Sequence, residues 1–323
     1  MKEYQIRPKG IFDKYLDLAK KDAEEIFSKA KYDKFNCPAC EKKNKFLFKK
    51  INFSYCECEK CKTLYVSPRP KFKYFSKYYN ESKSSKFWVT DFYKKTIKSR
   101  RSKIWKPKSK LVQKYLNENK GFKNIIDIGA GYGIFLDEIK KITNKQTYAL
   151  EPSKDLSEIC KKKHSIIQKF VEETKPADLP KGKNFYTCFE LFEHLHSPKI
   201  FIKKLSKIMK KNEILFLTTL SSTGLDIDIL KEKSKAVQPP YHINFFNPFS
   251  IRFFLEKNNF KIINISTPGK LDIDILENNK QYIENNFWKV FINKATFKEK
   301  KLMQKFLQKN LLSSHMIIVC IKK

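Results

Sequence analysis

The stretch Ile125-Ile-Asp-Ile-Gly-Ala-Gly-Tyr-Gly133 holds three of the eight glycines of this 323-residue chain within five positions. The apolar residues before Gly129 predict a buried strand, and the glycines predict a tight turn that leads into a helix. Because glycine has no Cβ atom, its backbone can approach a ligand closely, and the N–H groups of the helix start face that ligand. The stretch therefore predicts a ligand-binding loop in an α/β fold.

The spacing G-x-G-x-G in this loop differs from the G-x-G-x-x-G of the dinucleotide fingerprint. The next expected strand ends at Glu151, 20 residues after Gly131, where a carboxylate suits the hydroxyls of a ribose. An acid at this position also fits NAD, so Glu151 alone does not identify the nucleotide. A glycine turn without any ligand also stays open.

Apolar strands alternate with helical stretches from residue 123 to the end of the chain. This alternation predicts βαβ units and an α/β fold with a doubly wound, mostly parallel sheet. A basic helical region is expected at 71–118, with an interruption at Pro107. The expected strands are 124–128, 146–151, 165–170, 184–189, 214–220, 261–267 and 315–321, and further helices are expected at 11–30, 249–257 and 297–308.

Two Cys-x-x-Cys pairs, Cys37-Pro-Ala-Cys40 and Cys58-Glu-Lys-Cys61, are separated by 17 residues. This spacing is typical of a zinc ribbon, in which two turns present four thiolates to one metal ion. Four protein ligands leave no open position for a reactant, so the site is expected to be structural. Cys56 is interpreted as a spare that could replace Cys58. A free or redox-active thiol cluster, or iron in the same geometry, are the alternatives.

The chain has 68 Lys and Arg against 34 Asp and Glu, a formal net charge of +34. Only five of the basic residues are arginine, so much of this charge can reflect a lysine-rich composition rather than an anionic partner. The densest run, Lys94–Lys110, has nine basic residues and no acid, and is either an anion-facing patch or a solvated helix face. No apolar stretch is long enough to span a bilayer and the N-terminus has no secretory signal, so we expect a soluble cytoplasmic protein.

The loop Asp127–Gly133 resembles motif I of the class I S-adenosylmethionine-dependent methyltransferases, which reads (D/E)-x-G-x-G-x-G. The segment Cys188–Pro198 resembles the E-H-L-x-x-P segment that follows the fourth strand of that family. With the ribbon in front, the chain resembles bacterial methyltransferases with an N-terminal zinc-binding region, often of sugar or polysaccharide pathways. The resemblance implies a Rossmann-like seven-stranded sheet of order 3-2-1-4-5-7-6, with strand 7 antiparallel.

Three regions follow from the motifs and this resemblance. Residues 1–68 are expected to form a helix and a zinc ribbon, and residues 69–120 a basic helical connector. Residues 121–323 are expected to form the S-adenosylmethionine-binding domain, with an insertion at about 267–311. The cofactor-binding residues that the resemblance implies are Asp127, Gly129, Ala130, Gly131, Gly133, Glu151 and Glu190.

Methyl transfer is an in-line displacement, so the protein must position the acceptor and, for a hydroxyl, accept a proton. His194 follows strand 4, and Tyr241 and His242 follow strand 5, so all three are expected at the carboxyl edge of the sheet. His194 is the first candidate base, His242 the second and His315 a weaker third. The alternative for His194 is a packing role only, which is common for a histidine at the start of a helix. Deoxysugar C-methyltransferases with a similar zinc region have Y-H-E-H where this chain has Tyr241-His-Ile-Asn, which favours O- or N-methylation.

The sequence thus predicts a methyltransferase that uses S-adenosylmethionine, with a structural zinc ion. Its acceptor is expected to be a hydroxyl, or an amine or carbon, of a sugar, nucleotide-sugar or glycan, and a phosphate on the acceptor would account for the basic run. The alternative is an RNA methyltransferase that docks RNA on the ribbon and the basic run. The sequence Cys188–Leu191 lacks the (D/N)-P-P-(Y/F) of base N-methylating enzymes. A binding module that has lost catalysis is disfavoured by the intact glycine loop.

Overall fold

The computed structural model describes residues 1–323, which fold into two compact units. One unit, here the sheet unit, comprises residues 98–219, 252–265 and 317–323. The other, here the cysteine unit, comprises residues 1–97, 220–251 and 266–316. The domain boundaries expected from the sequence stay a prediction. None of the helices combines the length and the apolar character that crossing a membrane requires.

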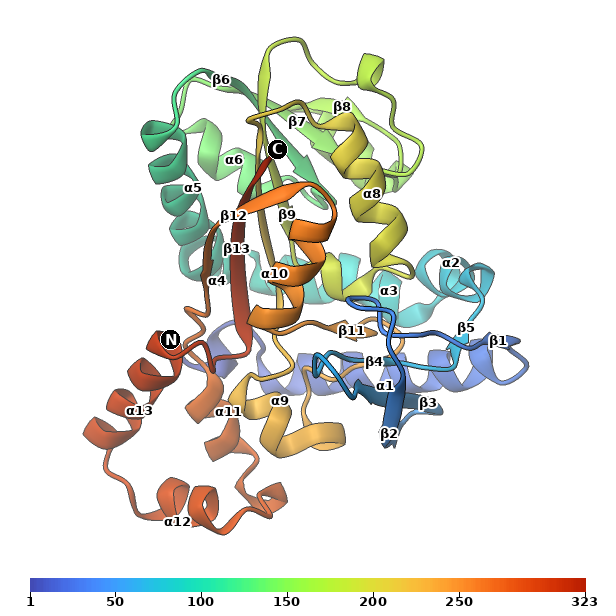
Figure 1. Cartoon of the computed structure of the whole chain (residues 1–323). Helices are drawn as coiled ribbons and strands as arrows, with labels where there is room; N and C mark the ends of the chain where they lie inside the picture. The colour runs from blue at the N-terminus through green and yellow to red at the C-terminus, as the bar shows by residue number, and fades with distance from the viewer. The chain divides into compact units, whose positions relative to one another are not determined.

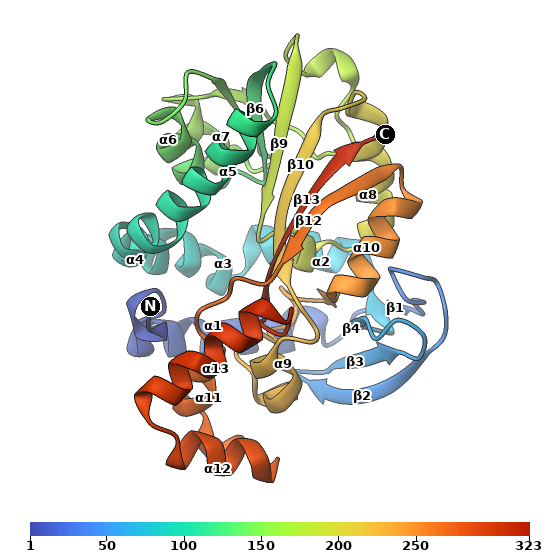
Figure 2. The same ribbon diagram turned by 60° about the vertical axis from the view of Figure 1, so that its left-hand side comes forward.

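A seven-stranded sheet runs in the order β8-β7-β6-β9-β10-β13-β12. The strands β6, β9, β10, β13 and β12 can be followed side by side in Figure 2. The five strands from β8 to β10 pair in parallel. Strand β13 runs antiparallel, because Lys322 at its end exchanges 2.9 Å backbone hydrogen bonds with Asn212 and Glu213, just before β10 begins. The expected order 3-2-1-4-5-7-6 is confirmed. The strands are β6 (Phe122–Ile128), β7 (Gln146–Leu150), β8 (Ser165–Ile167), β9 (Lys183–Phe189), β10 (Ile214–Leu220), β12 (Phe260–Ser266) and β13 (His315–Lys322).

Helices cover both faces of this sheet (Figure 2). On one face, Val112 of α5 and Leu136 of α6 pack in the same buried cluster as Phe185 of β9. On the other, Phe201 of α8 contacts the ring of Phe192 edge-on. These apolar stripes recur at helical spacing, which is why the segments fold as helices against a sheet. The helices are α5 (Lys106–Glu118), α6 (Ile134–Lys140), α7 (Lys154–Lys161), α8 (Pro198–Ile208) and α10 (Pro248–Lys257), with a π-helical segment η3 (Arg101–Trp105) before α5 and short 3-10 turns at η4 (Pro176–Asp178) and η5 (Phe192–His194).

The cysteine unit contains a four-stranded antiparallel sheet whose last strand comes from a distant part of the chain. Strands β2 and β3 form a hairpin, β4 pairs with β3, and β11 pairs with β4 through Asn244↔Tyr65 and Phe245↔Leu64. The sequence did not predict this return of the chain. The strands are β2 (Asn44–Lys50), β3 (Phe53–Cys58), β4 (Leu64–Val66) and β11 (Asn244–Phe245), with a separate pair β1 (Tyr32–Asp33) and β5 (Arg69–Pro70).

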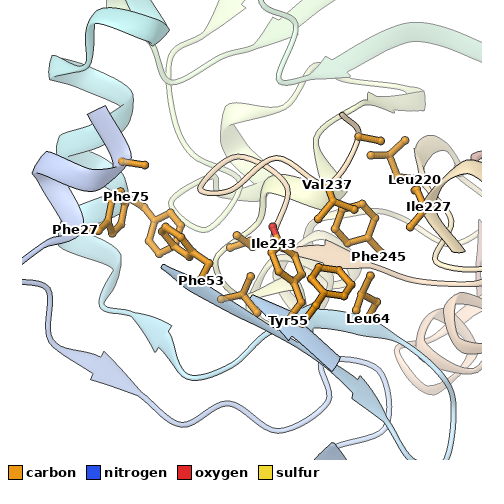
Figure 3. Close-up of a cluster of buried hydrophobic side chains, with 14 of the residues drawn as sticks. Phe27, Phe53, Tyr55, Leu64, Phe75, Leu220, Ile227, Val237, Ile243 and Phe245 are labelled. Atoms are coloured by element: carbon orange, nitrogen blue, oxygen red, sulfur yellow. The ribbon is translucent and has the colours of Figure 1, made fainter. Parts of the chain in front are cut away.

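The apolar core of this unit contains side chains from both the N-terminal region and residues 220–245 (Figure 3). Phe27 of α1 meets Phe53 of β3 edge-on, with 5.1 Å between ring centroids, and Ile243 and Phe245 are buried in the same cluster. Residues 220–245 are therefore part of the fold that carries the cysteines. The helices of the unit are α1 (Lys9–Phe27), α2 (Phe72–Glu81), α3 (Lys83–Phe87), the first part of α4 (Tyr93–Arg100), α9 (Leu225–Leu230), α11 (Asp272–Asn278), α12 (Asn286–Lys294) and α13 (Phe297–Lys309), with a π-helical segment η2 (Trp88–Phe92) between α3 and α4 and short 3-10 turns at η1 (Glu3–Gln5), η6 (Lys231–Lys233) and η7 (Lys280–Tyr282).

Candidate functional site

The glycine loop lies between β6 and α6, as the sequence predicts, and its backbone requires glycine. Gly129, Gly131 and Gly133 have φ values of +69°, +56° and +67°, in the left-handed region that side chains with a Cβ atom disfavour. A Cβ atom built on Gly131 would meet nothing within 4 Å, so open space lies beside this residue. A Cβ on Gly133 would instead lie 3.0 Å from the Cys160 Sγ. Gly131 is thus the position where a ligand can approach the loop.

Glu151 follows β7 and lies against this loop. Its Oε2 accepts a 2.9 Å hydrogen bond from the Gly131 N–H, and its Oε1 accepts a 3.0 Å hydrogen bond from the Ser153 N–H. Burial raises the pKa of Glu151, and the two N–H groups lower it. A carboxylate has about four acceptor positions, so two remain for further donors. This geometry suits a ligand with paired hydroxyls beside Gly131.

Asp127, at the end of β6, is buried and accepts a 2.7 Å hydrogen bond from the Thr187 hydroxyl of β9. Burial raises the pKa of this carboxyl to about 7, although the Thr187 bond works in the opposite direction. A positively charged ligand group nearby would favour the ionised form. Asp127 therefore provides a buried carboxyl suited to a cation.

Two further acids follow β9. Glu190 adopts a φ of +49°, and its Oε1 accepts hydrogen bonds from the Lys108 ammonium at 2.7 Å and from the Thr218 hydroxyl at 2.7 Å. Glu193 is buried and accepts a 2.9 Å hydrogen bond from the Thr219 hydroxyl. Burial, and then the negative charge of Glu190, raise the pKa of Glu193 to about 8. We call Asp127, Glu151, Glu190, Glu193 and the loop 129–133 the cofactor edge.

Lys108 is the residue of this edge that the sequence analysis missed, because it was counted only in the basic run. It is buried, and its ammonium lies 5.2 Å from the ring centroid of Trp105 and 5.0 Å from that of Phe189. Lys108 precedes the buried Val112 and Leu116 by four and eight residues, so the three share one helix face. A lysine in line with an apolar stripe is the signal that would have found it.

The residues of the cofactor edge fit S-adenosylmethionine. The buried Asp127 carboxyl suits its sulfonium or ammonium group, because a positive charge nearby would favour the ionised form of this carboxyl. Glu151 beside the open position at Gly131 suits its ribose. When bound, S-adenosylmethionine supplies an electrophilic methyl group. The residues that the sequence predicts to hold it are Asp127, Gly129, Ala130, Gly131, Gly133, Glu151 and Glu190, and this assignment stays a prediction. Lys108 would position Glu190 among them.

The candidate bases belong to different units. His194 ends the short turn η5 in the sheet unit, where its N–H donates a 2.9 Å hydrogen bond to the Leu191 carbonyl. His242 belongs to the cysteine unit, and its Nδ1 lies 2.6 Å from the Ala236 carbonyl oxygen. A carbonyl only accepts hydrogen bonds, so the proton of neutral His242 is on Nδ1 and its Nε2 is the basic nitrogen. His315 starts β13 and is half-buried.

Tyr241 is held within the cysteine unit by an aromatic cluster. Its hydroxyl lies 2.8 Å from the Ser85 hydroxyl, and its ring contacts Tyr78 edge-on at 5.2 Å and Tyr15 at 6.0 Å between centroids. Burial raises the pKa of Tyr241, so its hydroxyl stays protonated at neutral pH. It can donate or accept a hydrogen bond, but it is not a base.

Cys37, Cys40, Cys58 and Cys61 come together, with all four Sγ atoms within 4.8 Å of one another. Three of the Sγ–Sγ separations are 3.4, 3.4 and 3.5 Å. A tetrahedral zinc ion with Zn–S bonds of about 2.3 Å places its sulfurs about 3.8 Å apart, so the donor set fits this ion. We call these four residues the cysteine cluster. Cys56 lies outside it and donates to the Ser67 carbonyl.

The two Cys-x-x-Cys turns have the same backbone pattern. Cys37 N–H donates to Lys42 O and Glu41 N–H to Cys37 O; Cys58 N–H donates to Thr63 O and Lys62 N–H to Cys58 O. The residue after each turn, Glu41 or Lys62, has a positive φ of 62° or 57°. These are the paired knuckles that the spacing predicts for a zinc ribbon.

The basic run Lys94–Lys110 does not form a uniform patch. Arg101 pairs with Asp137 at 3.1 Å and with Glu138 at 2.5 Å, and Lys108 pairs with Glu190. Two of the nine basic residues are therefore committed to ion pairs inside the sheet unit. The remaining ones lie mostly on exposed helix surface.

Comparisons with known proteins identify the family to which the chain is similar. Residues 98–265 match a family model described as a methyltransferase domain. The ubiquinone biosynthesis O-methyltransferase of Pelagibacter ubique is 28% identical over 185 residues, which are 55% of this chain and 74% of that protein. The mitochondrial enzyme of the same name from Schizosaccharomyces pombe is 30% identical over 110 residues, 32% of this chain and 40% of that protein.

Among solved structures, an S-adenosylmethionine-dependent methyltransferase from Archaeoglobus fulgidus superposes with a TM-score of 0.46 at 18% identity, over 71% of this chain and all of that one. The family match stands on the sequence itself and spans more than half of the chain. It covers the strands β6, β7, β9 and β10 and every residue of the cofactor edge. The chain belongs to this methyltransferase domain family and is an S-adenosylmethionine-dependent methyltransferase.

Proposed function

We propose that this methyltransferase transfers a methyl group to a hydroxyl of a small-molecule acceptor at the carboxyl edge of the seven-stranded sheet. The observation that carries the proposal is the cofactor edge, where Glu151 accepts a hydrogen bond from the Gly131 N–H beside open space and Asp127 provides a buried carboxyl. Acceptor positions for a ribose, together with a carboxyl that a positive charge would ionise, favour a cationic nucleoside as the methyl donor. The chain's own residues bind the donor, orient the acceptor and accept the proton.

The choice of a hydroxyl on a small molecule has two supports. The curated relatives carry the name O-methyltransferase and serve ubiquinone biosynthesis, a small-molecule pathway. Tyr241-His242-Ile-Asn lacks the Glu-His pair of the C-methylating deoxysugar enzymes. Within this class, a sugar, nucleotide-sugar or glycan acceptor is the finer prediction from the sequence. RNA is less suited, because Arg101 and Lys108 of the basic run are engaged in ion pairs.

A histidine is the base that this geometry favours. The pKa of Glu193, raised to about 8, leaves that carboxyl largely protonated at neutral pH, so it does not accept a proton there. His242 has its basic Nε2 defined by the contact of Nδ1 with the Ala236 carbonyl. His194 follows the strand that carries Glu190. We assign the proton transfer to one of these histidines, and hydrogen bonding to Tyr241.

We further propose that the cysteine cluster holds a structural zinc ion. Its four sulfurs fill a tetrahedral shell, so an acceptor would find no open position on the metal. The ion would stabilise the two knuckles and the sheet β2-β3-β4-β11 built around them. Metal analysis of the purified protein tests this: about one zinc per chain is expected, and less than about half a zinc per chain would contradict it.

Methyl transfer from radiolabelled S-adenosylmethionine tests the acceptor class. Purified protein is incubated in parallel with nucleotide-sugars, with catechols and with transcribed RNA, and the labelled product is identified by mass spectrometry. Label on a hydroxyl of one of the small molecules supports the proposal. Label on RNA alone would replace it with the RNA alternative.

The same assay identifies the base. His194→Ala and His242→Ala are compared at saturating donor, and donor affinity is measured separately by calorimetry. Loss of kcat with unchanged donor affinity identifies the base, because a residue that only accepts the proton does not hold the donor. If both variants retain full turnover, neither histidine is the base.

A further inference from the structure

The segment between β12 and β13 forms a helical excursion of α11, α12 and α13. These three helices gather in one part of the cysteine unit (Figures 1 and 2). Ile292 of α12 and Leu307 of α13 are buried in a cluster with Leu276 of α11, so the excursion has its own small core. Nothing in the cofactor edge or the cysteine cluster uses α12 or α13.

The outer surface of α12 and α13 exposes an unusual number of large apolar side chains. Phe297 is 75% exposed, Val290 62% and Phe287 60%, and Leu302 and Phe306 are each 55% exposed. Of the 20 exposed large hydrophobic residues in the structure, seven lie between Tyr282 and Leu312. Such a concentration in about a tenth of the chain marks an interaction surface rather than scattered exposure.

Lysines surround these apolar side chains. The segment 280–309 contains eight lysines and two acids, a net charge of +6. One of the acids, Glu299, caps α13 by accepting from the Thr296 N–H, and Lys300 pairs with Glu277. The lysines that are exposed on α12 and α13 are Lys289, Lys294, Lys298, Lys301, Lys305 and Lys309.

The combination of exposed aromatic and lysine side chains on short helices is typical of segments that lie on a membrane surface. The apolar groups enter the boundary between headgroups and acyl chains, and the lysines contact anionic headgroups. A second copy of the chain would bring another charge of +6 against the same surface. A nucleic acid would offset the charge, but would leave Phe297, Val290 and Phe287 in water. An anionic bilayer satisfies both features.

We propose that α12 and α13 form a docking surface for a bilayer that contains anionic lipid, on which they lie without crossing it. The lysines provide the attraction and the exposed phenylalanines provide the anchorage. This inference does not depend on the acceptor class proposed above, because it rests on a surface separate from the cofactor edge and the cysteine cluster.

Vesicle flotation of the full chain tests the proposal. We expect the protein to float with vesicles of phosphatidylcholine and phosphatidylglycerol, and much less with phosphatidylcholine alone. The triple variant K298E/K301E/K305E should lose more than about 100-fold in partition, since each basic residue near an anionic surface contributes about fivefold. The triple variant F287S/F297S/F306S should also lose binding, because the apolar anchorage is gone. High salt should weaken binding by the wild type.

Phe46→Ser is the matched control, because Phe46 is 62% exposed but lies on β2 of the same unit. It should float like the wild type. All substituted side chains are exposed, and circular dichroism confirms that each variant is folded. Equal binding to both vesicle types, or no binding to either, would overturn the proposal. A dimer in light scattering that the phenylalanine variant dissociates would assign the surface to a second copy instead.

Discussion

The glycine loop and the cysteine knuckles are both turns with left-handed residues, but they use different residue types. The loop places glycine at all three of its positive φ values, whereas the knuckles place Glu41 and Lys62 there. A residue with a Cβ atom in this conformation costs roughly 1–2 kcal/mol. The loop therefore forms without strain and leaves space at Gly131, while the knuckles need another interaction to hold them.

This difference indicates how each site depends on its ligand. The loop follows the buried strand β6, its Gly129 N–H donates a 2.9 Å hydrogen bond to the Leu150 carbonyl of β7, and Glu151 already accepts a hydrogen bond from it. The knuckles bring together four thiol groups, which would repel one another once they are ionised. We therefore expect the cofactor edge to persist without its ligand, and the cysteine cluster to need its metal.

The largest expected effect is on the cysteine cluster. Cys58→Ser should remove one ligand and lower the free energy of unfolding by more than about 4 kcal/mol, because metal binding to such sites is coupled to folding. Denaturant unfolding and metal analysis on the same samples measure this. Treatment of the wild type with a strong chelator should have a similar effect.

Cys56→Ser is the matched control, because Cys56 is buried on the same hairpin but lies outside the cluster. It should keep its zinc and lose much less stability. A stable, zinc-free Cys58→Ser protein would show that the knuckles form without metal, and would remove the contrast with the glycine loop.

The second largest effect is on cofactor affinity, and it distinguishes Gly131 from Gly133 in the glycine loop. Gly131→Arg should lower the affinity for S-adenosylmethionine by at least about 100-fold, or about 2.7 kcal/mol, because the arginine side chain fills the open position beside residue 131. Calorimetry measures the affinity and thermal denaturation the stability. The strain of a positive φ at this position should cost only about 1–2 kcal/mol of stability.

Gly133→Ala is its counterpart. Its Cβ would lie 3.0 Å from the Cys160 Sγ and 3.3 Å from His164, so the cost should appear chiefly in stability, at about 2–4 kcal/mol, and the loss of affinity should be smaller than that of Gly131→Arg. If Gly131→Arg binds the cofactor as the wild type does, the loop is not the binding site. If both variants lose affinity equally, the loop acts as one rigid unit.

The features that the sequence predicted are those encoded in neighbouring residues. The strand and turn at 125–133 and the paired knuckles depend on local backbone requirements, and both are found. The order of the seven strands came from the family resemblance and is confirmed. The edge strand β8 stops at Ile167 rather than residue 170, because Lys169 N–H turns back to the Ile167 carbonyl.

The features that were missed depend on long-range contacts. Strand β11 has only two residues, and it pairs with β4 through partners far apart in the chain. The buried Arg69 donates a 2.8 Å hydrogen bond to the Asn244 Oδ1, 175 residues away, and no local pattern marks such a pair. The spacing of Lys108 to Val112 and Leu116 does place it on the buried helix face, but the neighbouring lysines made it look like one more exposed basic residue.

A smaller effect concerns this lysine. Lys108→Met should keep the apolar stem against Trp105 but leave Glu190 without its ammonium. We expect a loss of about 2 kcal/mol in stability, below the 3–5 kcal/mol of a fully buried pair because Glu190 is partly exposed. Urea unfolding measures it. Lys110→Met, on the exposed side of the same helix, is the control and should change stability by less than about 0.5 kcal/mol. Equal effects would mean that the Lys108–Glu190 pair contributes nothing.

The last comparison is between buried carboxyls of the two units, and its measure is a slope with pH rather than a single loss of stability. Burial raises the pKa of Asp127 in the sheet unit and of Asp226 in the cysteine unit to about 7, from an ordinary value of 3.8. Between about pH 4 and pH 7 each native carboxyl keeps a proton that the unfolded chain has released. The free energy of unfolding therefore falls as pH rises through this window, by up to about 1.4 kcal/mol per pH unit for each group.

Asp127→Asn and Asp226→Asn should each remove the contribution of one carboxyl to the slope of the free energy of unfolding against pH, since an amide does not titrate. Urea unfolding at several pH values above about 5, with zinc in excess, measures the slope without loss of metal from the cysteine cluster. If Asp127→Asn flattens the slope and Asp226→Asn does not, the pH dependence belongs to the cofactor edge, and a cationic ligand there should reduce it. An unchanged slope in both variants would mean that neither carboxyl is protonated in the folded protein at these pH values.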